Sequence, residues 1–155
     1  MRTKLVLAAL AMTAASALAD DEGLPPVADK TTLKECGACH MAFQPQFLPQ
    51  RSWRKIMDTL SDHFGEDVSL PDDLRKPILE YLLANAGDVS RQEMAREFVK
   101  SIPAGQTPLR ITEVPYWQKE HRRIREKEWT SAQVKSRSNC MACHEDAAAG
   151  FYENN

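Results

Sequence analysis

Apolar residues recur at helical spacing through the first half of the chain. From Ser52 to Phe64 they stand three or four positions apart, with Ser52 as the expected N-cap and Gly65 as the expected stop. A second pattern of this kind runs from Leu74 to Leu82, where Pro77 is expected to kink or divide the helix. No segment has the alternation of apolar and polar residues that is typical of a strand. The pattern therefore predicts an all-α fold.

The second half of the chain has a sparser apolar pattern. The spacing from Met94 to Ile102 predicts one amphipathic helix that ends before Pro103. Residues 104–115 combine turn-forming residues with few apolar side chains, which is typical of a linker. A helix that begins at Pro115 is expected to place Trp117, His121 and Ile124 on one face, and a last helix is expected to close at Gly150. This half of the chain contains too few apolar side chains to form a core alone. We therefore divide the chain into an N-terminal segment, residues 20–86, and a C-terminal segment, residues 87–155.

The first nineteen residues have the three parts of a secretory signal peptide. Two early positive charges precede a short apolar run, and Ala17-Leu18-Ala19 is a small-x-small cleavage site. The apolar run is shorter than the roughly 20 residues that a membrane-spanning helix needs. The alternative is an N-terminal helix of the fold itself. We predict that residues 1–19 are a signal peptide cleaved after Ala19, and that the protein is periplasmic and not integral to the membrane.

Composition limits the functions that the chain can have. With 155 residues it is too short for a large multi-domain enzyme, and a pI near 6.1 argues against a nucleic-acid partner. Residues 20–90 contain 7 basic and 13 acidic side chains, so the N-terminal segment is acidic. This imbalance favours a basic docking partner as a working hypothesis.

All four cysteines fall into two Cys-x-x-Cys-His motifs, the attachment signature of c-type haem. Two thiols three positions apart on a helical turn lie on one face and can reach the two vinyl groups of one porphyrin. The histidine that follows can then bind the iron. The sequence thus predicts two covalently attached haem c groups. The attaching residues are Cys36 and Cys39 with His40 in the first motif, and Cys140 and Cys143 with His144 in the second.

Other uses of paired cysteines compete with haem attachment. Four cysteines in an exported protein could form two disulfides, in which a bridged Cys-x-x-Cys pair would be a redox motif, and two Cys-x-x-Cys pairs could bind zinc. Zinc knuckles usually stand about 15 to 20 residues apart, whereas about 100 residues separate these two pairs. Neither use explains why a histidine follows both pairs. Haem attachment is therefore the prediction.

Only two further histidines are available as sixth ligands for the irons. His63 lies 23 residues after the first motif histidine, and His121 lies 23 residues before the second. Each could therefore serve the haem of its own segment, although an exchange of the two remains open. Met94 is a rival sixth ligand, and an open position that binds oxygen, nitric oxide or peroxide is a third possibility. We predict bis-histidine ligation at both irons.

Two stretches of the chain resemble known cytochromes. Residues 35–86, with a haem-motif helix, the Trp53 helix and the closing Tyr81-Leu82-Leu83-Ala84-Asn85, resemble a class I cytochrome c. In that class the distal ligand is normally methionine, and here His63 takes its place. The C-terminal segment is similar to the small dihaem cytochrome c family. The residues that carry this second resemblance are Pro108-Leu109-Arg110-Ile111-Thr112, Pro115-Tyr116-Trp117, His121 and the second haem motif.

The resemblance implies both a fold and a function. It implies a class I cytochrome c-like helical domain at residues 20–86 and a short, loop-rich, haem-wrapping domain at 87–155. Members of the family are periplasmic electron carriers, not enzymes, with two closely packed bis-histidine haems. Their implied partners are redox proteins, among them a monohaem oxygen-binding cytochrome and membrane b-type cytochromes.

Two alternative functions remain open on the sequence. One is the small dihaem subunit of a periplasmic nitrate reductase, although the separation of 104 residues between the two motifs counts against it. The other is a haem enzyme or gas-binding protein with one open iron position.

Overall fold

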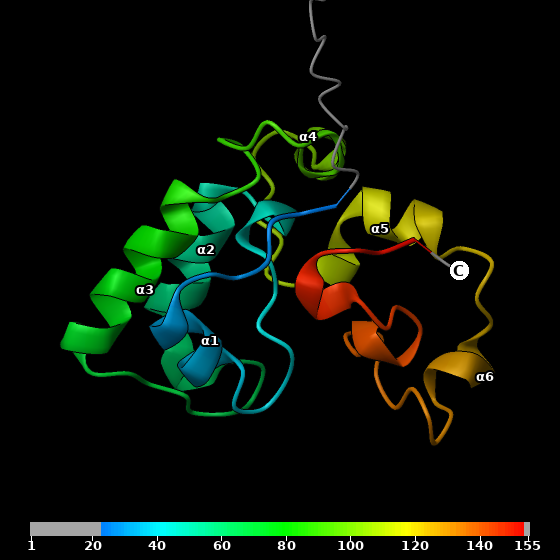
Figure 1. The fold of residues 1–155 in the computed structure, drawn as a ribbon, viewed down its shortest axis with the longest axis horizontal. Helices are drawn as coiled ribbons and strands as arrows, with labels where there is room; N and C mark the ends of the chain where they lie inside the picture. Colours follow the sequence, from blue (N-terminus) through cyan, green and yellow to red (C-terminus); the bar gives the residue numbers. More distant parts are fainter. Residues whose placement is uncertain (1–22, 154–155) are drawn as a thin grey trace, which may run out of the picture.

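Residues 23–153 form a helical structure with no β-strand in this part of the chain (Figure 1). This computed structural model contains only one β-type pairing among those residues, an isolated bridge between His63 and Glu66. The predicted all-α class is confirmed. The predicted signal peptide at 1–19 lies outside the described residues. No helix within residues 23–153 is long and apolar enough to span a bilayer.

The N-terminal segment is built on three α-helices. These are α1 (Lys30–Cys36), α2 (Gln50–Asp58) and α3 (Asp72–Ala84), with 3₁₀ turns at Pro45–Phe47 and Leu60–Asp62. Helix α2 packs along α3, and α1 also contacts α3. The buried faces of α2 and α3 carry Trp53, Ile56, Met57, Ile78 and Leu82. Apolar spacing in the sequence therefore identified the side chains that form this part of the core.

The predicted single helix from Ser52 to Phe64 is wrong in its bounds. Helix α2 starts earlier and ends at Asp58, and its N-cap is Pro49. The end has a local cause: the Thr59 hydroxyl donates to the Lys55 carbonyl at 2.8 Å, and its backbone leaves the helical region. The chain continues as a separate 3₁₀ turn, and His63 follows that turn.

Helix α3 runs unbroken through Pro77, so the predicted division there is also wrong. Pro77 lacks the N–H that would bond to the Asp73 carbonyl, one turn earlier. Both residues are exposed on the outer side of the helix, where water can reach that carbonyl. The helix therefore tolerates the proline.

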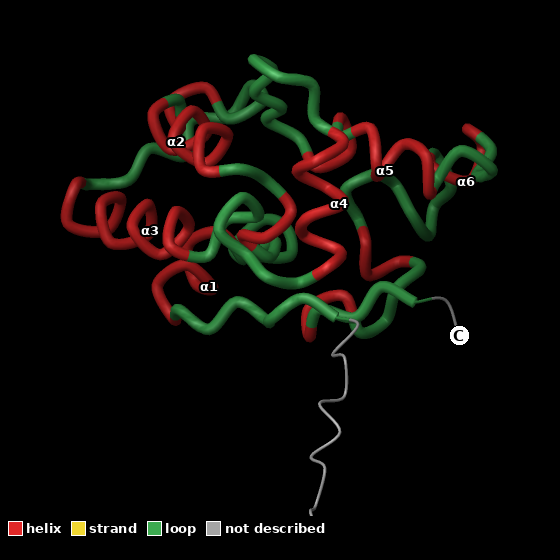
Figure 2. The backbone as a smooth tube through the Cα atoms, turned by 90° about the horizontal axis from the view of Figure 1, so that it is seen from above, coloured by secondary structure: helices red, strands yellow, loops and turns green. Residues whose placement is uncertain are grey.

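The C-terminal segment is made of short elements joined by long loops (Figure 2). Its helices are α4 (Glu93–Ser101), α5 (Pro115–Glu120) and α6 (Glu126–Trp129), with 3₁₀ turns at Ile111–Glu113, Cys140–Ala142 and Ala147–Ala149. Helix α4 agrees with the helix predicted from Met94 to Ile102. The second haem motif lies in a 3₁₀ turn and not in a longer helix that closes at Gly150.

One buried cluster joins the two segments. It includes Leu48 and Leu82 from the first and Phe98, Val114 and Trp117 from the second. In Figure 1 the red C-terminal turns lie beside the pale blue chain that follows α1. The division between residues 86 and 87 remains a prediction, and the core crosses it.

Candidate functional site

The four histidines meet in two pairs, one in each segment. The ring centroids of His40 and His63 are 6.3 Å apart, with an angle of 20° between their planes. Those of His121 and His144 are 6.1 Å apart, with the planes at 84°. Each distal candidate therefore lies beside the motif histidine of its own segment. Met94, the rival candidate, packs against the buried cluster.

Both separations fit one metal ion held between two imidazoles. An imidazole nitrogen binds a first-row metal ion at about 2.0 Å and lies about 1.1 Å from its ring centre, which places opposed centroids about 6.2 Å apart. Rings stacked face to face lie closer, as in the 4.2 Å stack of Trp117 on His121, whereas rings packed at an angle reach similar distances, as in the 5.7 Å pair of His144 and Tyr152. The spacing of both histidine pairs thus suits a haem iron.

In two of the four histidine rings, Nδ1 forms a hydrogen bond with a backbone carbonyl. Nδ1 of His40 lies 2.7 Å from the Met41 carbonyl, and Nδ1 of His121 lies 2.8 Å from the Trp117 carbonyl. A ring that donates from Nδ1 keeps the lone pair of Nε2 for a metal. Nδ1 of His144 is buried with no hydrogen-bond partner among the described residues. At least two of the four imidazoles therefore have an Nε2 lone pair that is available to a metal.

Burial lowers the pKa of two of the imidazoles, which favours their neutral form. It is the largest cause that lowers the pKa of His63, with further lowering by His40 and Arg110. Burial also lowers the pKa of His144, as does His121, while the Tyr152 backbone opposes the shift. Only a neutral imidazole can bind a metal, so these shifts favour ligation.

A tight turn presents His63 to the first site. The His63 N–H donates to the Glu66 carbonyl at 2.8 Å, and the Glu66 N–H donates back at 3.3 Å. The two central residues, Phe64 and Gly65, have positive φ angles of 60° and 99°. Positive φ at both positions is the pattern of a type I′ turn, which glycine favours and phenylalanine does not. The ring of Phe64 lies 4.7 Å from that of His63.

Aromatic rings surround the second site. Trp117 stacks on His121 at an interplanar angle of 16°, and Trp129 lies 5.9 Å from the same imidazole. On the other side, the ring of Tyr152 is 5.7 Å from that of His144. The predicted shared face of Trp117 and His121, four positions apart at the end of α5, is therefore present.

The four cysteines are free thiols, so neither motif contains a disulfide. Burial raises the pKa of the Cys36 thiol, and it raises that of the Cys140 thiol to about 11, which disfavours the thiolate that a zinc site requires. Within residues 23–153 no three His, Cys, Asp or Glu side chains gather in a way that could bind a metal ion. The zinc alternative requires such a gathering.

Exposed apolar side chains lie beside the same residues. Six large apolar side chains are exposed among residues 23–153. Four of them are within three positions of a motif cysteine or a paired histidine: Leu33, Phe64, Ile124 and Met141. A porphyrin has apolar faces that such side chains can cover. Both the histidine pairs and the exposed apolar side chains around them therefore fit a haem.

Several residues around the two sites were not identified from the sequence. Gln44 is fully buried and donates from Nε2 to the Ala147 carbonyl at 2.8 Å, 103 positions away, while its Oε1 accepts from the Tyr152 hydroxyl. Arg110 lies over the Phe64 ring, 3.6 Å from its centroid. No local pattern marks these residues, because both contacts join positions far apart in the chain.

Two attachment motifs, each with a histidine pair at metal-binding distance, define a c-type cytochrome with two haems. The chain matches the dihaem cytochrome c family over residues 32–152. It belongs to this family, and it carries two haem c groups with iron. Family membership supports haem-based electron transfer.

Three solved structures resemble the chain over most of its length. The dihaem cytochrome c from Rhodobacter sphaeroides is 40% identical with a TM-score of 0.73, covering 82% of this chain and 98% of its own. A crystal structure of DHC purified from Rhodobacter sphaeroides is 38% identical with a TM-score of 0.65, covering 81% of this chain and 99% of its own. The dihaem cytochrome from Shewanella baltica OS155 is 29% identical with a TM-score of 0.64, covering 80% and 86%. No match is found among curated proteins.

The different ring angles predict two distinct ferric haem signals. Two iron d orbitals can interact with the π systems of the axial imidazoles. Parallel imidazoles interact with the same one of these orbitals and separate the two in energy, whereas perpendicular imidazoles affect both orbitals equally and leave them close in energy. With planes at 20° in one pair and 84° in the other, the second haem should have the more anisotropic low-spin signal. Electron paramagnetic resonance of the ferric holoprotein at liquid-helium temperature tests this. One signal shape for both haems would contradict it.

Proposed function

We propose that this chain is a periplasmic electron carrier with two bis-histidine haems, exported by a signal peptide at residues 1–19. In this proposal Cys36 and Cys39 attach the first haem, and His40 and His63 bind its iron. Cys140 and Cys143 attach the second, and His121 and His144 bind its iron. The observation that carries the proposal is the separation of both histidine pairs, 6.3 Å and 6.1 Å, which suits an iron with both axial positions filled.

When bound, each haem supplies reversible one-electron chemistry at its iron. His40 with His63, and His121 with His144, would hold the two irons, and an iron held by two imidazoles could change its oxidation state without forming or breaking a ligand bond. Carbonyls of Met41 and Trp117 fix the ring orientation of His40 and His121. The rings of Trp117, Trp129 and Tyr152 pack around His121 and His144 at the second site. Filled axial positions and fixed rings suit electron transfer and not substrate binding.

The partners in this proposal are other redox proteins. The family resemblance suggests a monohaem oxygen-binding cytochrome or a membrane b-type cytochrome. Nucleic acid is not expected as a partner, because the chain is acidic overall.

Carbon monoxide tests the proposed function directly. Carbon monoxide binds ferrous haem only where the sixth position is open or weakly held. We expect the optical spectrum of the dithionite-reduced holoprotein to stay unchanged after carbon monoxide is added. Rapid binding at either haem would contradict bis-histidine ligation there, and would point to a gas-binding protein or haem enzyme instead.

A further inference from the structure

A basic cleft lies between α2 and the linker that precedes α5. Its volume is about 420 Å³, and Arg51, Arg54, Lys55, Asp58, Thr107 and Leu109 line it. The three cationic residues are exposed, and none of them forms an ion pair within residues 23–153. The cleft therefore carries positive charge that this part of the chain does not neutralise.

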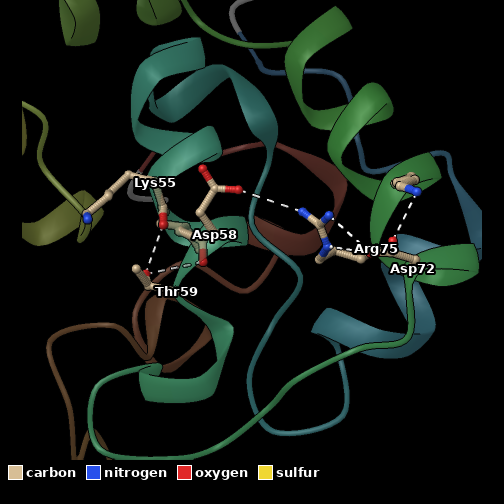
Figure 3. A network of polar contacts seen from close by, with 7 residues as sticks. Lys55, Asp58, Thr59, Asp72 and Arg75 are labelled. Carbon is tan, nitrogen blue, oxygen red and sulfur yellow. Dashed lines mark hydrogen bonds and ion pairs between the residues drawn. The ribbon is translucent and has the colours of Figure 1, made fainter.

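The one carboxylate that lines the cleft, Asp58, points toward Arg75 on α3. An oxygen of Asp58 lies 3.7 Å from Arg75, which also pairs with Asp72 at 3.1 Å. Figure 3 shows Asp58 turned toward Arg75 on α3, while the Lys55 side chain points the opposite way. On the other side, Arg51 donates from Nε to the Gln106 carbonyl at 2.7 Å, which fixes its guanidinium beside the linker. The three cations of the cleft thus outnumber its one carboxylate, which pairs with Arg75 outside the cleft.

A short series of contacts connects the cleft to the first haem site. Leu109 lines the cleft, and the next residue, Arg110, lies over the Phe64 ring at 3.6 Å. Phe64 in turn contacts His63 and is 44% exposed. A molecule seated in the cleft would therefore be connected to His63, the proposed distal ligand, through Arg110 and the exposed ring of Phe64.

We propose that this cleft is the docking site for the acidic surface of a redox partner protein that exchanges electrons with the first haem. The inference rests on the proposed function. It differs from the basic partner that composition favours, because the local charge is opposite in sign to that of the N-terminal segment as a whole. Carboxylates of a partner would compensate Arg51, Arg54 and Lys55 and steer its approach.

A stopped-flow experiment with an acidic protein donor tests the proposal. The probe is a reduced plant-type ferredoxin, a low-potential donor that loses one electron to a ferric haem with no proton transfer. The cleft variant R51Q/R54Q/K55Q is compared with R91Q/R96Q/K127Q, which removes three exposed, ion-pair-free charges elsewhere among the described residues. Absorption spectra and both reduction potentials of each holoprotein are recorded in parallel.

We expect the second-order rate of the cleft variant to fall about tenfold at about 0.01 M ionic strength, and that of the matched variant less than about threefold. The wild-type rate should approach the variant rate at about 0.5 M salt, where charges are screened. Equal losses in both variants, with electron transfer retained, would overturn the docking site and leave the carrier function standing. Carbon monoxide binding to the wild type would instead remove the carrier function.

Two other results would reassign the cleft. A shifted potential or lower haem content in the cleft variant, with the salt dependence of the wild type retained, would assign its cations to the haem propionates. Loss of binding to anionic phosphatidylglycerol vesicles, with an unchanged ferredoxin rate, would assign them to a membrane surface. Either result would overturn docking of a protein partner.

Discussion

Replacing Gly150 by alanine should destabilise the folded protein by about 3–5 kcal/mol. Gly150 has a φ of 98°, and a Cβ there would lie 1.7 Å from the Leu24 carbonyl oxygen and 2.8 Å from its carbon. Neither atom can move freely, because the Leu24 N–H donates to the Gly150 carbonyl at 2.9 Å and the Leu24 side chain is buried. The variant must break this backbone contact or distort the turn that closes the second haem segment.

Gly105→Ala is the matched control for that substitution. Gly105 also has a positive φ, 83°, but a Cβ there would meet nothing within 4 Å. Gly105→Ala should lower the free energy of unfolding only by the cost of a positive φ for alanine, about 1–2 kcal/mol. Guanidinium unfolding of the ferric holoproteins, followed by far-UV circular dichroism, measures both free energies. A Gly150→Ala cost no larger than that of Gly105→Ala would mean that the close approach to Leu24 has no energetic weight.

Structural features that depend on only a few consecutive residues could be predicted from the sequence. The two Cys-x-x-Cys-His motifs needed no tertiary information, because attachment depends on spacing inside one turn. The helix from Met94 and the shared face of Trp117 and His121 also followed from local periodicity. In each case the relevant side chains lie within about two turns of one helix, where backbone geometry fixes their relative directions.

Features that depend on turns or distant contacts could not be predicted in this way. Periodicity placed His63 inside a helix, whereas Thr59 ends α2 and a turn with a strained Phe64 presents the imidazole. Gln44 looks like an ordinary loop residue, yet it is buried against the C-terminal turn 103 positions away. Such contacts form only when two distant segments pack together, so the spacing of residues along the sequence cannot predict them.

The position of His63 depends on a residue of the other segment. Phe64 keeps a backbone conformation that costs a bulky residue about 1–3 kcal/mol, and the Arg110 guanidinium covers its ring at 3.6 Å. Arg110 is itself held by Glu113, whose carboxylate accepts from the Arg110 backbone N–H at 3.3 Å. The neighbouring Ile111 is buried in the shared core. The C-terminal segment therefore holds the turn that carries His63, the proposed distal ligand of the first haem.

Replacing Arg110 by alanine should make the first haem accessible to carbon monoxide. Loss of a cation–π contact of about 0.5–2 kcal/mol would raise the population with His63 detached by roughly 2- to 30-fold. Carbon monoxide should then bind one haem per protein, with a rate raised by about the same factor, while the second haem stays closed. His63→Ala sets the upper limit, since it removes the ligand altogether. Stopped-flow absorption of the ferrous holoproteins gives both rates.

A double-mutant cycle separates the contact with Arg110 from the backbone strain. Asn tolerates positive φ, so Phe64→Asn relaxes the turn and also removes the ring that Arg110 covers. If Arg110 acts through Phe64, adding Arg110→Ala to Phe64→Asn should change the carbon monoxide rate no further. Additive effects would mean that Arg110 acts on the first haem by another route, such as its charge beside His63. Equal opening of both haems in Arg110→Ala would instead mean a general loosening of the fold, because no contact of Arg110 reaches the second histidine pair within the described residues.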